Sequence, residues 1–244
     1  MIRDRKRALG ALALVVSMAS GAASAWAEVG AGAYPAMAPR SQYMMDRTAE
    51  IALARTAGPA ALSKDASILV LGPHGFETAA KGANPFTCLV ERSWDKPFDD
   101  AEFWNQKMRG PVCMNDAAVR TVLPMILERA EWALSGVSKA EMAQRSKTSA
   151  KANMPPAPGA MSYMLSKEQY LSDDNGHPWH PHVMFFSPVT DGSTWGADVK
   201  GSPVLSGTLT SQVTLFFIPV RQWSDGTLAD YGPPAMAPDD HHQH

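Results

Sequence analysis

Several motifs that identify common enzyme classes are absent from this sequence. Its 244 residues contain no G-x-S-x-G nucleophile elbow and no H-E-x-x-H zinc motif. No glycine-rich phosphate loop joins a predicted strand to a helix, since Gly30-Ala31-Gly32 lies in a segment without such a unit. No internal repeat is found either. Motifs of these kinds therefore assign no activity to the chain.

Cysteine is scarce, with only Cys88 and Cys113 in the chain. The two are too far apart for a C-x-x-C motif, which argues against redox-active or metal-bound thiols. In an exported protein an even number of cysteines indicates a disulfide. We therefore predict a Cys88–Cys113 bond, which would close a loop of about 25 residues and stabilise the fold by roughly 3–4 kcal/mol. Reduced Cys88 beside His180 would instead reopen the option of a Cys–His nucleophile.

No apolar run long enough to span a bilayer follows the N-terminus. Residues 1–27 have the form of a signal peptide, with four basic residues before an apolar run over 8–20. Ala25-Trp26-Ala27 fits the A-x-A cleavage pattern, and Ala23-Ser24-Ala25 is an alternative. The apolar run is shorter than the roughly 20 residues of a transmembrane helix. We therefore predict Sec-type export to the periplasm or the medium, with no membrane span after cleavage.

Basic charge is in short supply once this segment is removed. The whole chain has 22 Lys and Arg against 24 Asp and Glu, a formal net charge of −2. Cleavage after residue 27 removes four basic residues and one acidic residue, which leaves 217 residues with a charge of −5. Nucleic acid is bound by clustered Lys and Arg, so this balance excludes it as a partner. A chain of this length suits one domain with a sizeable core.

The order of predicted elements indicates a single α+β domain. We place this domain over residues 42–231, after a flexible leader over 28–41 and before a disordered tail over 232–244. It opens with a short helix over 42–56. Strands are predicted over 67–71, 76–81 and 86–92 as a meander, and again over 160–165, 182–186 and 209–220. We expect a mostly antiparallel sheet covered by one long helix over 115–135, which Pro124 kinks.

Two stretches around the cysteines, together with the histidine-rich segment 177–186, carry a resemblance. The first reads N-P-F-T-C-L-V-E-R-S-W over 84–94, and the second joins E-F-W at 102–104 to M-R-G-P-V-C at 108–113. With these motifs the chain resembles a family of uncharacterised exported bacterial proteins with no assigned activity, over most of the mature length. The resemblance implies a shared fold and export, and it implies no reaction, cofactor or catalytic residue.

Three of the seven histidines lie within six residues, at His177, His180 and His182. If a strand begins at His180, the two-residue period puts His180 and His182 on one face, where both imidazoles could reach one metal ion. His177 could add a third nitrogen, and the shell could be completed by Glu91, Asp173, Asp174 or His74. Imidazole with carboxylate suits Zn, Cu or Fe(II). The alternative is that these histidines are ordinary half-buried polar residues, because H-x-H alone is a weak signal.

Tryptophans gather in the predicted loops. Trp94 and Trp104 belong to an irregular segment over 93–115, and Trp179 belongs to the histidine segment. Side chains of this kind cover the edge of a core or line an apolar cleft. We expect a cleft between the 93–112 loop and the histidine segment, with Trp94, Trp104, Trp179 and Glu91 as ligand-binding residues.

The sequence supports two main hypotheses about function. The first is an exported, non-catalytic protein that binds a small molecule or an envelope partner. The second is a metal-dependent hydrolase or oxidase that uses His177, His180 and His182 with Zn, Cu or Fe. Convergence of His180 and His182 with another His, Asp or Glu around an open pocket would favour the second. A structural component of the envelope is a third option.

Overall fold

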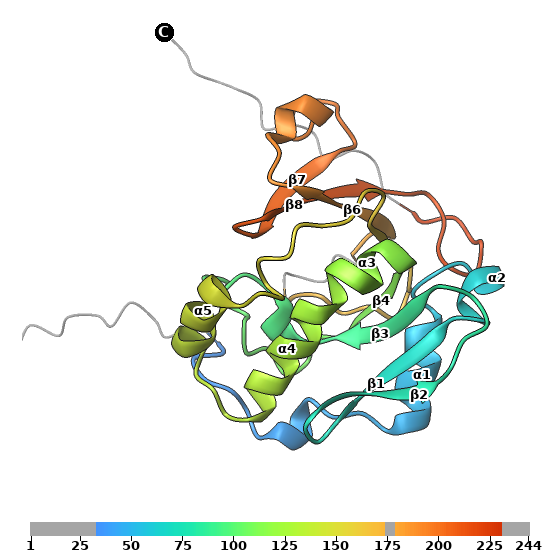
Figure 1. Ribbon diagram of the computed structural model, residues 1–244. Helices are drawn as coiled ribbons and strands as arrows, with labels where there is room; N and C mark the ends of the chain where they lie inside the picture. Colours follow the sequence, from blue (N-terminus) through green and yellow to red (C-terminus); the bar gives the residue numbers. More distant parts are fainter. Residues whose placement is uncertain (1–32, 174–178, 231–244) are drawn as a thin grey trace, which may run out of the picture. The chain divides into compact units, whose positions relative to one another are not determined.

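The computed structural model describes residues 33–173 and 179–230. In these residues the chain forms helices and one eight-stranded open sheet, with the strand order β2-β1-β3-β4-β5-β6-β8-β7 (Figure 1). Every pair of neighbouring strands is antiparallel except β1 and β3. The α+β class and the mostly antiparallel sheet are therefore confirmed. The predicted signal peptide over 1–27 and the predicted tail over 232–244 lie outside the described residues.

The strands are β1 (Ser67–Gly72), β2 (Gly75–Ala80), β3 (Thr87–Glu91), β4 (Gly110–Met114), β5 (Met161–Met164), β6 (His182–Pro188), β7 (Leu205–Thr210) and β8 (Val213–Pro219). The apolar segment 209–220, predicted as one strand, lies mostly in β8. It also contains the end of β7 and the Ser211-Gln212 connection, because β7 and β8 form an antiparallel hairpin.

The first three strands do not form the predicted meander. Strands β1 and β2 are a hairpin, but β3 lies on the other side of β1 and runs parallel to it. The connection from β2 to β3 crosses the start of β1, where the amide of Gly82 donates to Ser67 Oγ at 3.0 Å. A Cβ on Gly82 would lie 2.3 Å from the Ser67 nitrogen, so this close crossing requires glycine.

The helices are α1 (Arg47–Arg55), α2 (Ala60–Ser63), α3 (Asp116–Thr121), α4 (Leu123–Leu134) and α5 (Lys139–Thr148). The short N-terminal helix is thus present as α1, and it begins later than predicted because Asp46 accepts a hydrogen bond from the Ala49 amide at 3.0 Å. Within the described part of the chain, no helix is both long enough and apolar enough to cross a membrane.

The single long kinked helix is not confirmed. Two helices, α3 and α4, occupy that segment and meet at Val122, where φ is −112° and ψ is −47°. Pro124 has no N–H to donate to the preceding turn, so it stands in the first turn of a new helix, where no intrahelical bond is lost. The proline therefore ends one helix and starts the next.

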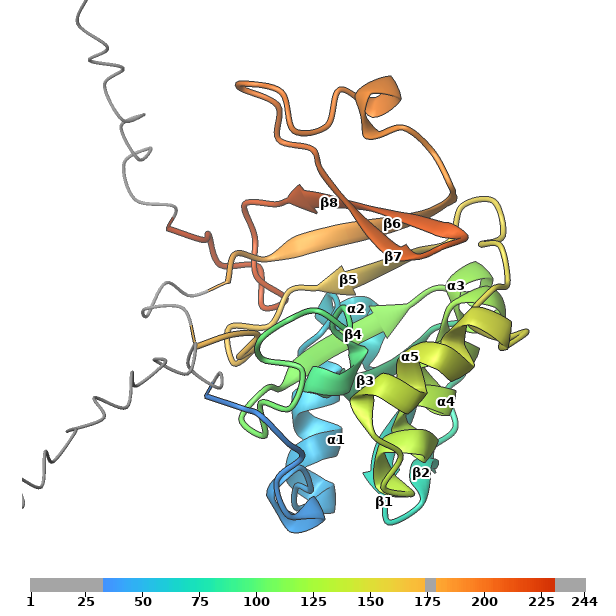
Figure 2. The ribbon, with the colours of Figure 1, turned by 90° about the vertical axis from the view of Figure 1, so that its left-hand side faces the viewer.

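Helices pack on both faces of the sheet. Helix α1 contacts β1, β3 and β4, and the core on this side includes Ile68, Val70 and Val90. On the opposite face α3 and α4 pack with Leu89, Val112 and the apolar residues of β6 and β8 (Figures 1 and 2). Residues 33–41 of the predicted leader also pack here, since Tyr34 and Met37 lie against the buried cluster around Trp94.

The predicted Cys88–Cys113 disulfide is present. The two cysteines face each other across β3 and β4, and both are fully buried. The bond closes the segment 88–113, which contains the long loop between these strands. The two ends of that loop are therefore held covalently beside each other.

A candidate ligand cavity

A cavity of about 390 Å³ lies against one face of the sheet. Its floor comes from alternate residues of β6, β8 and β7, which point to the same side of the sheet. The register places Met184 opposite Phe217, Phe186 opposite Leu215, and Leu215 opposite Gly207. All five line the cavity. Gly207 has no side chain, so no side chain from this position of β7 fills the cavity.

The wall comes from several other segments, which include Met108, Met164, Leu171 and Trp179. Val122, Met125 and Ile126 come from the junction of α3 and α4, and residues 95–97 with Asp100 come from the loop after β3. The lining is mostly apolar, and the volume lies toward the lower end of the roughly 300–1,000 Å³ that ligand pockets occupy. The space therefore suits a small, mainly apolar molecule.

Three carboxyl groups stand in this apolar lining, and one of them, that of Asp100, pairs with Lys96 at 3.5 Å. Glu91 is the last residue of β3, and its carboxyl group makes no hydrogen bond or ion pair with any residue that the structure describes. Asp95 lies in the short 3-10 helix Ser93–Asp95; its Oδ2 accepts a hydrogen bond from the Arg92 amide at 3.3 Å, and its buried Oδ1 has no partner among the described residues. Both keep partial exposure because part of their surface lines the cavity.

The guanidinium of Arg129 is a cation whose charge acts on the carboxyl groups of both Glu91 and Asp95. Arg129 is 3% exposed, and its Nη1 donates to the carbonyls of Trp94, Asp95 and Lys96 at 3.4, 3.2 and 3.1 Å. Its planar group also lies 4.5 Å from the centre of the Phe98 ring. The cation is thus committed to the backbone of the loop, and no ion pair within 4.0 Å joins it to either carboxylate among the described residues.

This environment raises both carboxyl pKa values. Burial raises the pKa of Glu91 well above its ordinary value, and the charge of Asp95 raises it further, against the opposing effect of Arg129. Burial also raises the pKa of Asp95 to about 7, although Arg129 and the Arg92 amide oppose the shift. Near neutral pH the pair therefore retains a proton that exposed carboxylates would have lost.

Glu91→Gln is expected to make the protein more stable at alkaline pH. The folded-state pKa of Glu91 lies above the unfolded value of roughly 4.3, so above that pH the unfolded chain binds fewer protons and the free energy of unfolding of the wild type falls as pH rises. One such group changes it by up to about 1.4 kcal/mol per pH unit. Gln removes the charge, so urea unfolding from about pH 5 to 8 should show its advantage growing with pH.

The matched control for this substitution is the exposed Glu168→Gln, which should run parallel to the wild type. A constant difference between Glu91→Gln and the wild type over the same pH range would contradict the raised pKa of Glu91.

His182 also lines the cavity, on the side of β6. It is 5% exposed, and its Nδ1 lies 2.8 Å from the His180 carbonyl, which can only accept, so Nδ1 carries the hydrogen and Nε2 is the acceptor. Burial lowers the pKa of His182, and the nearby His180 lowers it too, although the bond to the carbonyl opposes this. The ring packs beside Trp179 and Phe217, with centroids 6.3 and 5.9 Å apart. A neutral imidazole is thus a further polar group of the lining.

Of the three predicted metal-ligating histidines the structure describes His180 and His182, whose surroundings differ. Strand β6 begins at His182, so the two-residue period does not extend to His180, which is exposed. His177 lies outside the described residues. Over 33–173 and 179–230, no group of three His, Cys, Asp or Glu could hold a metal ion. The metal site with Zn, Cu or Fe stays a prediction.

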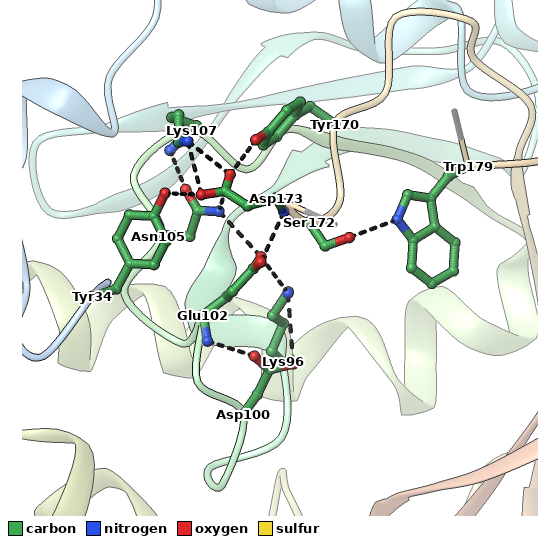
Figure 3. A network of polar contacts seen from close by, with 10 residues as sticks. All are labelled: Tyr34, Lys96, Asp100, Glu102, Asn105, Lys107, Tyr170, Ser172, Asp173 and Trp179. Carbon is green, nitrogen blue, oxygen red and sulfur yellow. Dashed lines mark hydrogen bonds and ion pairs between the residues drawn. The ribbon is translucent and has the colours of Figure 1, made fainter. Parts of the chain in front are cut away.

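A polar network joins the loop after β3 to the segment before β6 (Figure 3). The carboxylate of Asp173 accepts hydrogen bonds from Tyr34, Tyr170, Asn105 and Lys107, the last at 2.8 Å. Its amide donates to Glu102 at 2.8 Å. These contacts hold the chain at 170–173 against the loop that supplies Asp95 and Asp100 to the cavity.

Trp179 is placed by a similar contact. Its indole nitrogen donates to Ser172 Oγ at 3.1 Å, and the ring lines the cavity (Figure 3). Of the four predicted ligand-binding residues, Trp179 and Glu91 therefore line the cavity. Trp94 and Trp104 instead belong to the buried cluster around Tyr43, 0% and 5% exposed, and line no part of it.

The residues 93–96 match the S-x-x-K spacing of some serine enzymes, but they form no catalytic pair. Ser93 Oγ is buried without a partner among the described residues. The ammonium of Lys96 pairs with Asp100 at 3.5 Å and with Glu102 at 3.0 Å. Nothing in this contact pattern activates the serine hydroxyl.

Asp95 and the apolar floor were not predicted as site residues. The floor has a partial signal, because the apolar runs over 183–186 and 213–218 predict strands, although they do not show which face lines a cavity. Asp95 has none, since one acid among several in a polar loop does not reveal its burial. Comparison of the chain with protein-family models, with curated proteins and with solved structures gave no match.

Proposed function

We propose that this protein binds a small, mainly apolar molecule in the cavity between β6–β8 and the loop after β3. One observation carries the proposal: an apolar cavity of about 390 Å³ whose lining includes the carboxyl group of Glu91, which has no partner among the residues that the structure describes. Protein interiors are close-packed, and buried polar groups normally have a partner. A ligand with an apolar body and one polar group would supply both the missing packing and the missing partner.

The rest of the lining supports a binding role. Trp179 and Phe217 offer flat apolar surfaces, and His182 Nε2 offers an acceptor. The network around Asp173 holds the wall in place, so the site does not depend on ligand binding to assemble it. We therefore favour a binding protein over the metal-dependent hydrolase or oxidase.

We also propose that the protein acts outside the cytoplasm. The signal-peptide pattern over 1–27 and the resemblance to exported bacterial proteins support export. The Cys88–Cys113 bond is consistent with it, because disulfides persist in oxidising compartments.

Gly207→Leu is expected to abolish ligand binding. A Cβ at Gly207 meets only the Phe217 ring, at 3.7 Å, so the larger side chain can enter the cavity without forcing the backbone apart. 1-Octanol should raise the Tm of the wild type in a concentration-dependent way, because a ligand that binds only the folded state stabilises it. It should not raise the Tm of Gly207→Leu.

Gly207→Ala is the matched control, since it changes the same position but fills little of the space; it should keep most of the shift. Circular dichroism would establish that both variants fold. No shift with the wild type, or equal shifts for the wild type and Gly207→Leu, would refute binding at this site.

A further inference from the structure

The charges around the cavity do not balance. Among the residues that the structure describes, the acids of the lining are Glu91, Asp95 and Asp100, and Glu102 lies next to them because it shares Lys96 with Asp100; the cations that act on these acids are Lys96 and Arg129. Arg92 adds no further positive charge to this balance, because it pairs with Glu50 at 2.8 Å. His182 is neutral. If all four acids are ionised, this group of residues therefore carries more negative than positive charge.

The uncompensated charge belongs to Glu91 and Asp95. Lys96 is committed to Asp100 and Glu102, at 3.5 and 3.0 Å. Arg129 lies behind the loop, where its Nη1 donates to backbone carbonyls. One positive charge is therefore shared by two partly buried carboxylates, and leaving the second one unpaired in an apolar lining is costly.

We propose that the ligand carries a protonated nitrogen, an ammonium group, which pairs with the Glu91 carboxylate beside Asp95 while its apolar body lies along Met184 and Leu215. The inference rests on the proposed function and specifies its ligand class. An ammonium group supplies the missing positive charge and donates hydrogen bonds to a carboxyl group that has none from the described residues. A carboxylate ligand would instead add to the negative charge and is excluded.

Without ligand, a proton takes the place of this charge. The raised pKa values of Glu91 and Asp95 express the same imbalance in the empty cavity. An ammonium ion therefore displaces that proton when it binds, and by linkage its affinity rises with pH over the range in which the pair titrates. The affinity of a neutral ligand has no such rise.

The test compares n-octylamine with 1-octanol, which have the same chain and differ in the charged group. Isothermal titration calorimetry from about pH 5.5 to 7.5 should show the affinity for n-octylamine rising roughly tenfold, with 1-octanol showing no rise. In buffers of different ionisation enthalpy, n-octylamine binding should release a proton fraction of about one half on average over this range, larger at its acid end. These measurements use the wild type and need no variant to fold.

Glu91→Gln should lower the ratio of the n-octylamine affinity to the 1-octanol affinity roughly tenfold near pH 7.5. Asp99→Asn, which removes an exposed acid from the same loop, should leave this ratio unchanged. Equal affinities for the two probes in the wild type, or no proton release, overturn the ammonium ligand while 1-octanol binding upholds the cavity as a site. Failure of both probes to bind overturns the proposed function itself.

Discussion

Arg92→Met is expected to lower the free energy of unfolding by about 3–5 kcal/mol. Arg92 and Glu50 are 0% and 1% exposed, and Arg92 Nη2 lies 2.8 Å from Glu50 Oε1. The guanidinium also donates to the carbonyls of Tyr43 and Val90, and Glu50 accepts from the Leu71 amide at 3.2 Å. Removing the arginine leaves a buried carboxylate without its counter-ion, and that unpaired charge is the source of the loss.

The matched control replaces both partners. In Glu50→Leu/Arg92→Met no buried charge is left, so the double variant should recover much of the stability that the single variant loses. Urea unfolding of the wild type, both single variants and the double variant gives the coupling energy directly. A loss below about 1 kcal/mol in Arg92→Met would mean that the pair contributes no more than a surface salt bridge.

This pair lies next to the cavity. Arg92 follows Glu91 in sequence, and its amide donates to Asp95. Loss of the guanidinium therefore disturbs the end of β3, which carries Glu91, and the 3-10 helix after it, which carries Asp95. We expect 1-octanol binding to weaken in Arg92→Met, whereas the substitution of an exposed residue would not affect it.

Local patterns in the sequence predict many of the strands and the disulfide. The short apolar run within 182–186 predicts β6, and the branched run over 67–71 predicts β1. The order in which the strands pair in the sheet could not be predicted in this way, because it depends on contacts between distant segments. The parallel neighbours β1 and β3 depend on the crossing at Gly82, where the nitrogen of Ser67 leaves no room for a Cβ. No periodicity in the sequence contains this information.

The candidate site also combines features that the sequence predicts with features that depend on distant contacts. Glu91 was predicted as a ligand-binding residue, and it lines the cavity. The raised pKa of Glu91 could not be predicted, because it depends on residues far along the chain. Arg129, whose charge opposes the shift, comes from α4. Trp94 and Trp104 show the opposite case: they lie in a loop segment, yet packing against Tyr43 and α4 buries them in the core.

Removal of the disulfide is expected to cost about 3–4 kcal/mol in Cys88→Ala/Cys113→Ala, because the unfolded chain then gains the freedom of a loop of 25 residues. Each single variant already breaks the bond, so each should cost nearly as much as the double variant, and urea unfolding of all three measures this. Costs of the two single variants that add up to that of the double variant would instead assign the effect to lost side-chain packing.

The closed loop supplies Asp95, Asp100 and Met108 to the cavity. Because the bond joins its two ends, we expect its loss also to weaken 1-octanol binding in protein that is still folded.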